Sequence, residues 1–264
     1  MIKIFKTNKK YLLLVIIICL LLSINVEAID YKNVKVSEKY LQKLEKVHVE
    51  KVIDGDTIVI ENGETIRFIG VDTPEYEESF YAKTATAFTK NKLLNRDVYI
   101  ELDKDKFDKH GRILAYIYTE EGKFFNALLL QKGRAMLLSV PPNTKYMKIM
   151  QEMAKQARDN ESGLWEDLPI LSWKNAGDYQ GKLAIIRGKI IATYDSGKAT
   201  FLNFDKEYWH TFSAVIFNNN MYRFNFSPAE YYLEKRVRIM GKIKIYKNSH
   251  EIIVRSPAQI KVLP

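Results

Sequence analysis

The chain has 264 residues, of which 47% are hydrophobic and 28% are charged. This composition is typical of globular proteins and argues against a disordered chain, and the length allows one large domain or two small ones. The formal net charge is +9, and Cys19 is the only cysteine, which excludes a disulfide within the chain.

Residues 1–28 have the pattern of a secretory signal peptide. Four lysines precede the uncharged run YLLLVIIICLLLSI, and Val26 and Ala28 are placed for cleavage after Ala28. The run is shorter than the roughly 20 residues that span a membrane. We therefore expect a secreted, extracellular protein without thiol chemistry, associated with the membrane only if the signal is not cleaved.

The first globular unit is predicted at 46–168, after a polar leader or linker at 29–45. Alternation of apolar and polar residues predicts strands, and Asn62-Gly63 predicts a hairpin between two of them. The predicted elements are strands at 47–54, 56–62, 64–72, 97–103, 112–123 and 134–140, and helices at 79–95, 124–133 and 143–160. In the last helix we expect Asn143 or Thr144 as the N-cap and Met147, Met150 and Ala154 in the core.

A second unit is predicted at 181–264, after a linker at 169–180. Strand patterns at 182–194, 198–204, 211–217, 236–247 and 251–263, with a short helical insert at 227–235, predict a small barrel of the OB type. The fold class is therefore mainly β with helices (α+β).

The charge is unevenly divided between the two units. Residues 169–264 carry 15 lysines and arginines against 7 aspartates and glutamates, a net charge of +8, whereas residues 29–168 sum to −2. A basic second domain favours a polyanionic partner such as nucleic acid. Solubility, or adhesion to an anionic cell envelope, is the alternative reading of the same charge.

Acidic residues gather where predicted strands end. Asp54 and Asp56 flank Gly55 in VIDGDT, and Asp72 and Thr73 end the third strand in VDTPE. A tight turn would explain the first pair. If the strand ends converge, Asp56, Asp72 and the carbonyl of Thr73 could share a hard cation such as Ca²⁺ or Mg²⁺.

Two arginines accompany this acidic set. Arg67 lies on the third strand, and Arg112 follows a turn at Gly111. Arginines beside a cation site make chemical sense when the ligand is an anion with several oxygens, such as a phosphodiester.

The segments VIDGDT, RFIGVDTPE and DKHGRILAYIY resemble, in order and internal spacing, three signature segments of the staphylococcal nuclease (thermonuclease) family. The resemblance covers about residues 46–166. It implies a five-stranded OB-type barrel with three helices. It also implies Ca²⁺-dependent hydrolysis of DNA and RNA, with little sequence preference, to 3′-phosphate products.

The resemblance also assigns roles by motif position. Asp56 and Asp72 would bind Ca²⁺ through their side chains and Thr73 through its carbonyl, while Asp54 would support the site through water. The catalytic residues would be Glu75 as general base and Arg67 and Arg112 as stabilisers of the transition state. A non-catalytic nucleic-acid-binding protein on the same fold is the alternative, which the presence of all these side chains disfavours.

The chain also departs from the family. Ser139 and Pro141 stand where nucleotide-stacking tyrosines are expected, and His110 replaces a tyrosine. The loop after Glu75 is short and acidic. We therefore expect weaker substrate binding by the first domain alone, since each stacked base contributes about 1–3 kcal/mol.

The second domain is predicted to compensate by binding nucleic acid. Phe201 and Phe204 are expected mainly in its core. The candidate contacts in both domains are Lys109, His110, Arg187, Lys198, Trp209, Arg223 and Arg236. Deleting residues 169–264 should then raise KM for long DNA and flatten its salt dependence. We expect a monomer, and no protein partner is implied.

Overall fold

The computed structural model describes residues 29–30, 34–74, 79–207 and 211–264. The predicted signal peptide lies outside these ranges. Within them, no helix is both long enough and apolar enough to cross a membrane.

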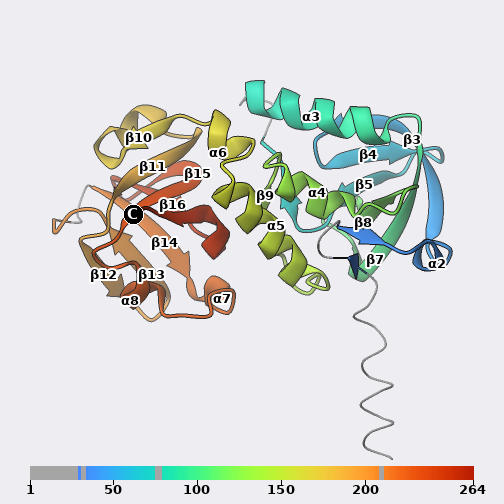
Figure 1. Ribbon diagram of the computed structural model, residues 1–264. Coiled ribbons are helices and arrows are strands. Elements are labelled where there is room, and N and C mark those ends of the chain that lie inside the picture. The colour runs from blue at the N-terminus through green and yellow to red at the C-terminus, as the bar shows by residue number, and fades with distance from the viewer. Residues whose placement is uncertain (1–28, 31–33, 75–78, 208–210) are drawn as a thin grey trace, which may run out of the picture.

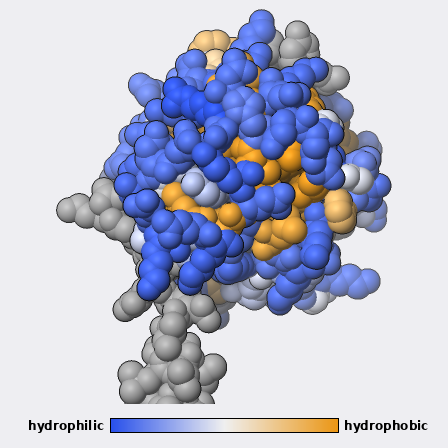
Figure 2. Space-filling model, turned by 90° about the vertical axis from the view of Figure 1, so that its right-hand side faces the viewer, coloured by the Kyte–Doolittle hydropathy of each residue, from blue (hydrophilic) through white to orange (hydrophobic). Residues whose placement is uncertain are grey.

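The first domain is built on a closed barrel, as predicted. Its strands follow the order β3-β4-β5-β8-β7; β5 and β8 run parallel and the other pairs antiparallel. Figure 1 shows this barrel at one end of the molecule, and Figure 2 shows that end to be largely hydrophilic, with hydrophobic residues visible near the centre. The strands are β3 (Glu45–Asp54), β4 (Thr57–Ile60), β5 (Thr65–Phe68), β7 (Asp97–Phe107) and β8 (Ile113–Thr119).

Helices and a short strand pair complete this domain. They are α3 (Ser79–Leu93), α4 (Phe125–Gln131), α5 (Met147–Asp159) and α6 (Leu164–Asp167), with β6 (Val71–Asp72) paired to β9 (Met136–Leu137). Met147, Met150 and Ala154 are buried, which confirms the predicted core face of α5. The predicted N-cap is wrong: α5 begins at Met147, and the Asn143 amide instead exchanges two 2.8 Å bonds with the backbone of Asp105.

Residues 34–45, predicted as part of a leader, belong to the first domain. Val34, Val36 and Leu41 are buried in the same core as the barrel strands. The Val36 N–H donates to the Gly122 carbonyl, and the Phe124 N–H donates to the Val34 carbonyl, both at 2.9 Å. Three isolated apolar residues carry no periodic signal, so the sequence did not reveal this packing. The elements here are β1 (Ile29–Asp30), β2 (Lys35–Val36) and α2 (Glu38–Leu41).

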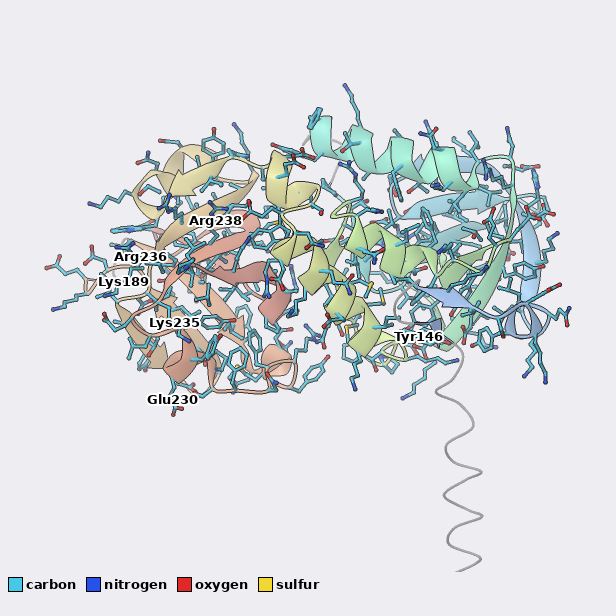
Figure 3. The ribbon with its side chains drawn as sticks, viewed as in Figure 1. Tyr146, Lys189, Glu230, Lys235, Arg236 and Arg238 are labelled. Carbon is cyan, nitrogen blue, oxygen red and sulfur yellow. The ribbon has the colours of Figure 1, made fainter. Side chains whose placement is uncertain are left out.

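A buried carboxylate ties α2 to the barrel and to the start of α5. Glu101 on β7 accepts hydrogen bonds from Tyr40, Tyr118 and Tyr146 at 2.8–3.1 Å and pairs with Lys145. Figure 3 labels Tyr146 on the side of the first barrel, near α5 and β7. Because the three tyrosines come from α2, from β8 and from the residue before α5, this cluster fixes the packing of these elements on β7.

The second domain repeats the topology of the first. Its strands run in the order β10-β11-β15-β16-β14-β13-β12, with β17 also paired to β15, and β14 and β16 are parallel. The hydrogen-bonded order runs from β11 through β15, β16, β14 and β13 to β12. Only two residues join β11 to β12 along the chain, so the sheet returns on itself. This supports the predicted OB-like barrel. The strands are β11 (Leu183–Lys189), β12 (Ala192–Asp195), β13 (Ala199–Asn203), β14 (Phe212–Phe217), β15 (Arg236–Tyr246), β16 (Ser249–Ile253) and β17 (Ile260–Val262).

Residues 169–180, predicted as a linker, pack on the second domain. They contain β10 (Ile170–Ser172), which runs parallel to β11, and the 3-10 helix η2 (Trp173–Tyr179), whose Ala176 is in the core. Phe204 is also in that core, as predicted, whereas Phe201 is only partly buried. The remaining helices are α7 (Asn218–Met221), α8 (Pro228–Tyr232) and η3 (Pro257–Gln259).

The two domains meet through an apolar cluster. Trp165 and Leu164 of α6 pack with Leu183, Ile185 and Met240 on the outer face of β11 and β15. Figure 1 shows α5 and α6 between the two barrels.

Arginines from both sides reinforce this contact. The Arg158 guanidinium donates to the carbonyls of Pro257 and Ile260, each at 2.8 Å, and the Arg223 guanidinium donates to the carbonyls of Arg255 (2.8 Å) and Ser139 (3.1 Å). Buried apolar area and satisfied polar groups together hold the two barrels in one orientation.

Candidate active site

A pocket of about 680 Å³ lies on the first domain between the β3–β4 turn, the β6 segment and helix α3. Its walls bring together most of the acidic and basic residues that the motifs singled out. They include Asp54, Asp56, Arg67, Asp72, Thr73 and Arg112, together with Lys83 and Lys90 of α3. The lysines carry no motif signal, because helical lysines usually face solvent, and the sequence therefore missed them.

The VIDGDT turn is shaped by close approach to neighbouring elements. A Cβ atom on Gly55 would lie 2.7 Å from the Thr73 side chain and 2.8 Å from that of Ala85. The Thr89 hydroxyl donates a 2.6 Å hydrogen bond to the Gly55 carbonyl. Glycine is required here because the turn presses against both the β6 segment and α3, so it brings Asp56 beside Thr73.

Asp56 is almost completely buried, with 4% of its surface exposed. Its carboxylate accepts bonds from the Thr73 N–H (2.7 Å), the Thr73 hydroxyl (2.8 Å) and the Thr57 hydroxyl (3.1 Å), and it pairs with Arg67 (3.1 Å). Burial raises the pKa of Asp56 to about 6, and the charge of Asp54 adds to this rise, although Arg67 and Thr73 oppose it. The site thus holds a carboxylate whose negative charge is not fully compensated.

Asp54 supports the turn. Its Oδ1 accepts a 3.0 Å bond from the Asp56 N–H, which places it behind Asp56 and also on the pocket wall. The turn interpretation and the cation-site interpretation of this pair are therefore compatible.

Arg67 links the two predicted metal-binding carboxylates. Its Nε lies 3.1 Å from Asp56 Oδ1 and its terminal nitrogen lies 3.3 Å from Asp72 Oδ1, so both carboxylates converge on one group. The guanidinium is further fixed by bonds to the carbonyls of Phe68 (2.9 Å) and Val71 (2.8 Å).

These residues fit a hard divalent cation. Asp56, Asp72 and the Thr73 carbonyl offer only oxygen, the donor type that Ca²⁺ prefers. Within the described ranges, no group of three or more histidine, cysteine, aspartate or glutamate side chains forms a metal cluster. A site with two side-chain carboxylates would need backbone carbonyls and water for its remaining ligands.

Arg112 is aimed into the pocket by Asp108. Its Nε and a terminal nitrogen both lie 2.7 Å from Asp108 Oδ2, while Asp108 Oδ1 accepts from the N–H groups of His110 and Arg112. Burial acts to raise the pKa of Asp108, but these bonds hold it below its ordinary value. The sequence alone did not predict this role for Asp108. The only signal is its spacing of four residues before Arg112.

The other candidates have different positions. Glu75 and Trp209 lie outside the described residues. Lys109 and His110 are exposed at the β7–β8 turn and do not line the pocket. The candidates Arg187, Lys198 and Arg236 are exposed on the second domain and do not line the pocket.

Arg223 requires a correction. It is buried, and its guanidinium is bonded to the Asn220 side chain and to the carbonyls of Arg255 and Ser139. Its role is therefore to join the domains rather than to contact nucleic acid. At the same place, the Ser139 hydroxyl lies 3.2 Å from the Tyr222 hydroxyl of the second domain.

Comparison with known proteins agrees with this geometry. Residues 65–167 match the profile of the family described as "Staphylococcal nuclease homologue". The chain is 40% identical over 126 residues to the thermonuclease of Staphylococcus intermedius, covering 45% of this chain and 74% of that protein. The chain belongs to the staphylococcal nuclease family.

Two more relatives support the same assignment. The thermonuclease of Staphylococcus hyicus is 37% identical over 127 residues (45% of this chain, 75% of that protein), and an endonuclease of Bacillus subtilis is 36% identical over 137 residues (48% and 64%). As a member of the staphylococcal nuclease family, the protein is a nuclease hydrolase. The profile match ends at residue 167, so it does not include the second domain.

Proposed function

We propose that this nuclease hydrolyses phosphodiester bonds of both DNA and RNA, with little sequence preference, and leaves 3′-phosphate ends. The observation that carries the proposal is the pocket in which Arg67 and Arg112 line the same walls as Asp56 and Asp72. Two guanidinium groups can hold the phosphate oxygens and stabilise the charge that develops in the transition state.

Ca²⁺ is the proposed cofactor. Asp56 and Asp72 would hold it through their side chains and Thr73 through its carbonyl, with Asp54 acting through water. A bound calcium ion supplies positive charge that offsets the developing negative charge on the phosphate. The raised pKa of Asp56 supports this assignment, because a cation would compensate a charge that the protein leaves only partly balanced.

Glu75 is the proposed general base. It follows Pro74, which lines the pocket, by one residue, and it would take a proton from the attacking water. The bond between phosphorus and the 5′ oxygen then breaks, and the 5′ oxygen leaves with a proton from solvent.

Digestion of single-stranded DNA, double-stranded DNA and RNA, each with Ca²⁺, with Mg²⁺ and with a chelator, tests this function. We expect cleavage of all three polymers with Ca²⁺ and none with the chelator, with terminal phosphates at 3′ ends. Replacing Arg112 by Gln should lower kcat by about 10²–10³-fold, as when a transition-state contact is lost. A matched control, Arg187→Gln on the second domain, should keep full kcat.

Full activity of Arg112→Gln would contradict the assigned role. Binding of DNA without cleavage under every condition would favour the alternative, a non-catalytic nucleic-acid-binding protein.

Secretion is also proposed, from the signal-like pattern of residues 1–28. Amino-terminal sequencing of the protein recovered from culture medium should begin at Ile29. Recovery of the uncleaved chain in the membrane fraction would contradict cleavage.

A further inference from the structure

A second, smaller groove adjoins the catalytic pocket. Its volume is about 290 Å³, and it shares three wall residues with that pocket: Asp72, Thr73 and Pro74. Its opposite wall comes from the second domain. The residues there are Leu183, Lys242, Lys244, Ile253 and Arg255. The groove thus begins at the proposed metal-binding segment and ends on the other barrel.

We propose that this groove is a binding subsite for the phosphate backbone of the nucleic-acid substrate, on one side of the bond that is cleaved. The proposal rests on the proposed nuclease function and extends it to the second domain, for which the family comparison gives no role. Lys242, Lys244 and Arg255 would contact phosphates that lie beyond the reach of Arg67 and Arg112.

Strand β15 explains why the cations face the catalytic domain. Side chains alternate between the two faces of a strand, and the face of β15 that carries Met240 packs against α6 of the first domain. Lys242 and Lys244 follow on that same face, two and four residues further along. Strand β15 therefore continues beyond the domain contact and places Lys242 and Lys244 in the groove that Asp72 also lines.

The groove has a fixed shape because the domains are locked together around it. The apolar cluster with Trp165 and Met240 lies on one side. On the other, the Arg223 guanidinium bonds to the backbone carbonyl of Arg255, a groove residue, and to Ser139 of the first domain. A preformed cationic wall binds a polyanion with less loss of conformational entropy than a mobile one.

The charge of the groove suits a polyanion. Three cations line the groove together with the carboxylate of Asp72, which the proposed calcium ion would neutralise. Glu251 is paired across the sheet with Lys244, and partial burial raises the pKa of Glu251, while Lys244 opposes that rise.

The cations continue on the far side of the catalytic pocket. Lys83 and Lys90 of α3 line that pocket. A single strand crossing the active site would therefore meet positive charge both before and after the cleaved bond. These cations on both sides of the cleaved bond would bind the phosphate backbone and so offset the lack of stacking tyrosines at positions 139 and 141.

The test compares two triple variants with the same change of charge. The groove variant is Lys242→Gln/Lys244→Gln/Arg255→Gln. The matched control, Lys174→Gln/Lys189→Gln/Lys206→Gln, removes three exposed cations elsewhere on the second domain. Figure 3 shows Lys189 at the end of that domain furthest from the first barrel.

The first measurement is binding of fluorescent single-stranded DNA in chelator, at several salt concentrations. Losing three phosphate contacts should reduce the slope of log K against log salt by about 2, because each contact on a single strand contributes about 0.7. Between 50 and 200 mM salt, the wild type should then lose roughly 20-fold more affinity than the groove variant. The control should keep the wild-type slope.

The second measurement is hydrolysis with Ca²⁺. The groove variant should show a higher KM for long single-stranded DNA and an unchanged kcat. Both kinetic constants for a dinucleotide should stay at the wild-type values, since a dinucleotide is too short to reach the groove.

An unchanged salt slope in the groove variant, or an equal loss in the control, would overturn the proposal. So would a variant that binds DNA normally but no longer binds an anionic wall polymer. Absence of hydrolysis in the wild type would refute the proposed function, while the binding measurement would still decide the groove. If the triple variant does not fold, the exposed single change Lys244→Glu replaces it, with the same expected direction.

Discussion

Replacing Asp56 by Asn should make the protein more stable at pH 8 in the absence of calcium. Asp56 is buried, and its pKa is raised from the ordinary value of 3.8 to about 6. A raised pKa in the folded state means that ionisation costs more in the folded than in the unfolded chain. Stability from this group is therefore fully present below about pH 3.8 and is lost as pH rises through about 6.

The pKa difference sets the magnitude. A rise of about 2 pH units corresponds to about 3 kcal/mol of unfolding free energy above pH 7. Asn resembles the neutral acid and keeps one oxygen to accept the two bonds from Thr73, but it loses the ion pair with Arg67. We therefore expect a gain of about 1–3 kcal/mol.

Urea unfolding measured in chelator at pH 8 and at pH 4 checks this reasoning. The gain should be present at pH 8 and should nearly vanish at pH 4. Saturating Ca²⁺ should stabilise the wild type by mass action and the variant much less. As a control, Asp72→Asn changes a carboxylate with 49% of its side chain exposed, so it should alter stability by well under 1 kcal/mol.

A variant that is less stable than the wild type at pH 8 would refute the reasoning. An equal gain at both pH values would also refute it, because the effect would then not come from the charge of Asp56.

Substitutions at two further residues, Asp108 and Glu101, test side chains that do not line the pocket. Asp108→Asn keeps the turn acceptor but removes the charge that aims Arg112, so kcat should fall about 10- to 100-fold with an unchanged circular dichroism spectrum. Asp108→Glu should retain more activity, and equal losses in both variants would contradict a positioning role. Glu101→Gln should lower the free energy of unfolding by about 2 kcal/mol in urea titrations, because the tyrosine hydroxyls lose hydrogen bonds to a charged acceptor, while Lys145 is half exposed and can be solvated. A change below about 1 kcal/mol would mean that the cluster contributes little.

The sequence predicted the barrels well because their strands alternate in hydrophobicity. The hairpin at Asn62-Gly63 and the buried methionines of α5 follow from local rules of this kind, and the structure agrees with them. The sequence failed where packing depends on residues that are far apart. Val34 and Val36 enter the core and bond to the segment between β8 and α4, and no local pattern signals such contacts.

The site shows the same division. The motifs predicted that Asp56, Arg67 and Asp72 share one site. Asp56 follows β3, Arg67 lies on β5 and Asp72 comes four residues after the end of β5, so all three are near neighbouring strands of one barrel. The motifs could not show that Asp108 orients Arg112, since a DKHGR segment also suits a solvated turn. They also could not distinguish Arg223, which is buried at the domain contact, from an exposed arginine of the same basic domain.

The contact between the domains changes how the role of the second domain should be tested. Deleting residues 169–264 would uncover Leu164 and Trp165, which pack against Met240, and would remove the acceptors of Arg158. A truncated nuclease would then lose stability as well as the basic domain, and exposed apolar surface favours aggregation. A rise in KM after truncation would have two causes. The groove variants change only side chains that line the groove, so a change in their salt slope reports on the phosphate contacts alone.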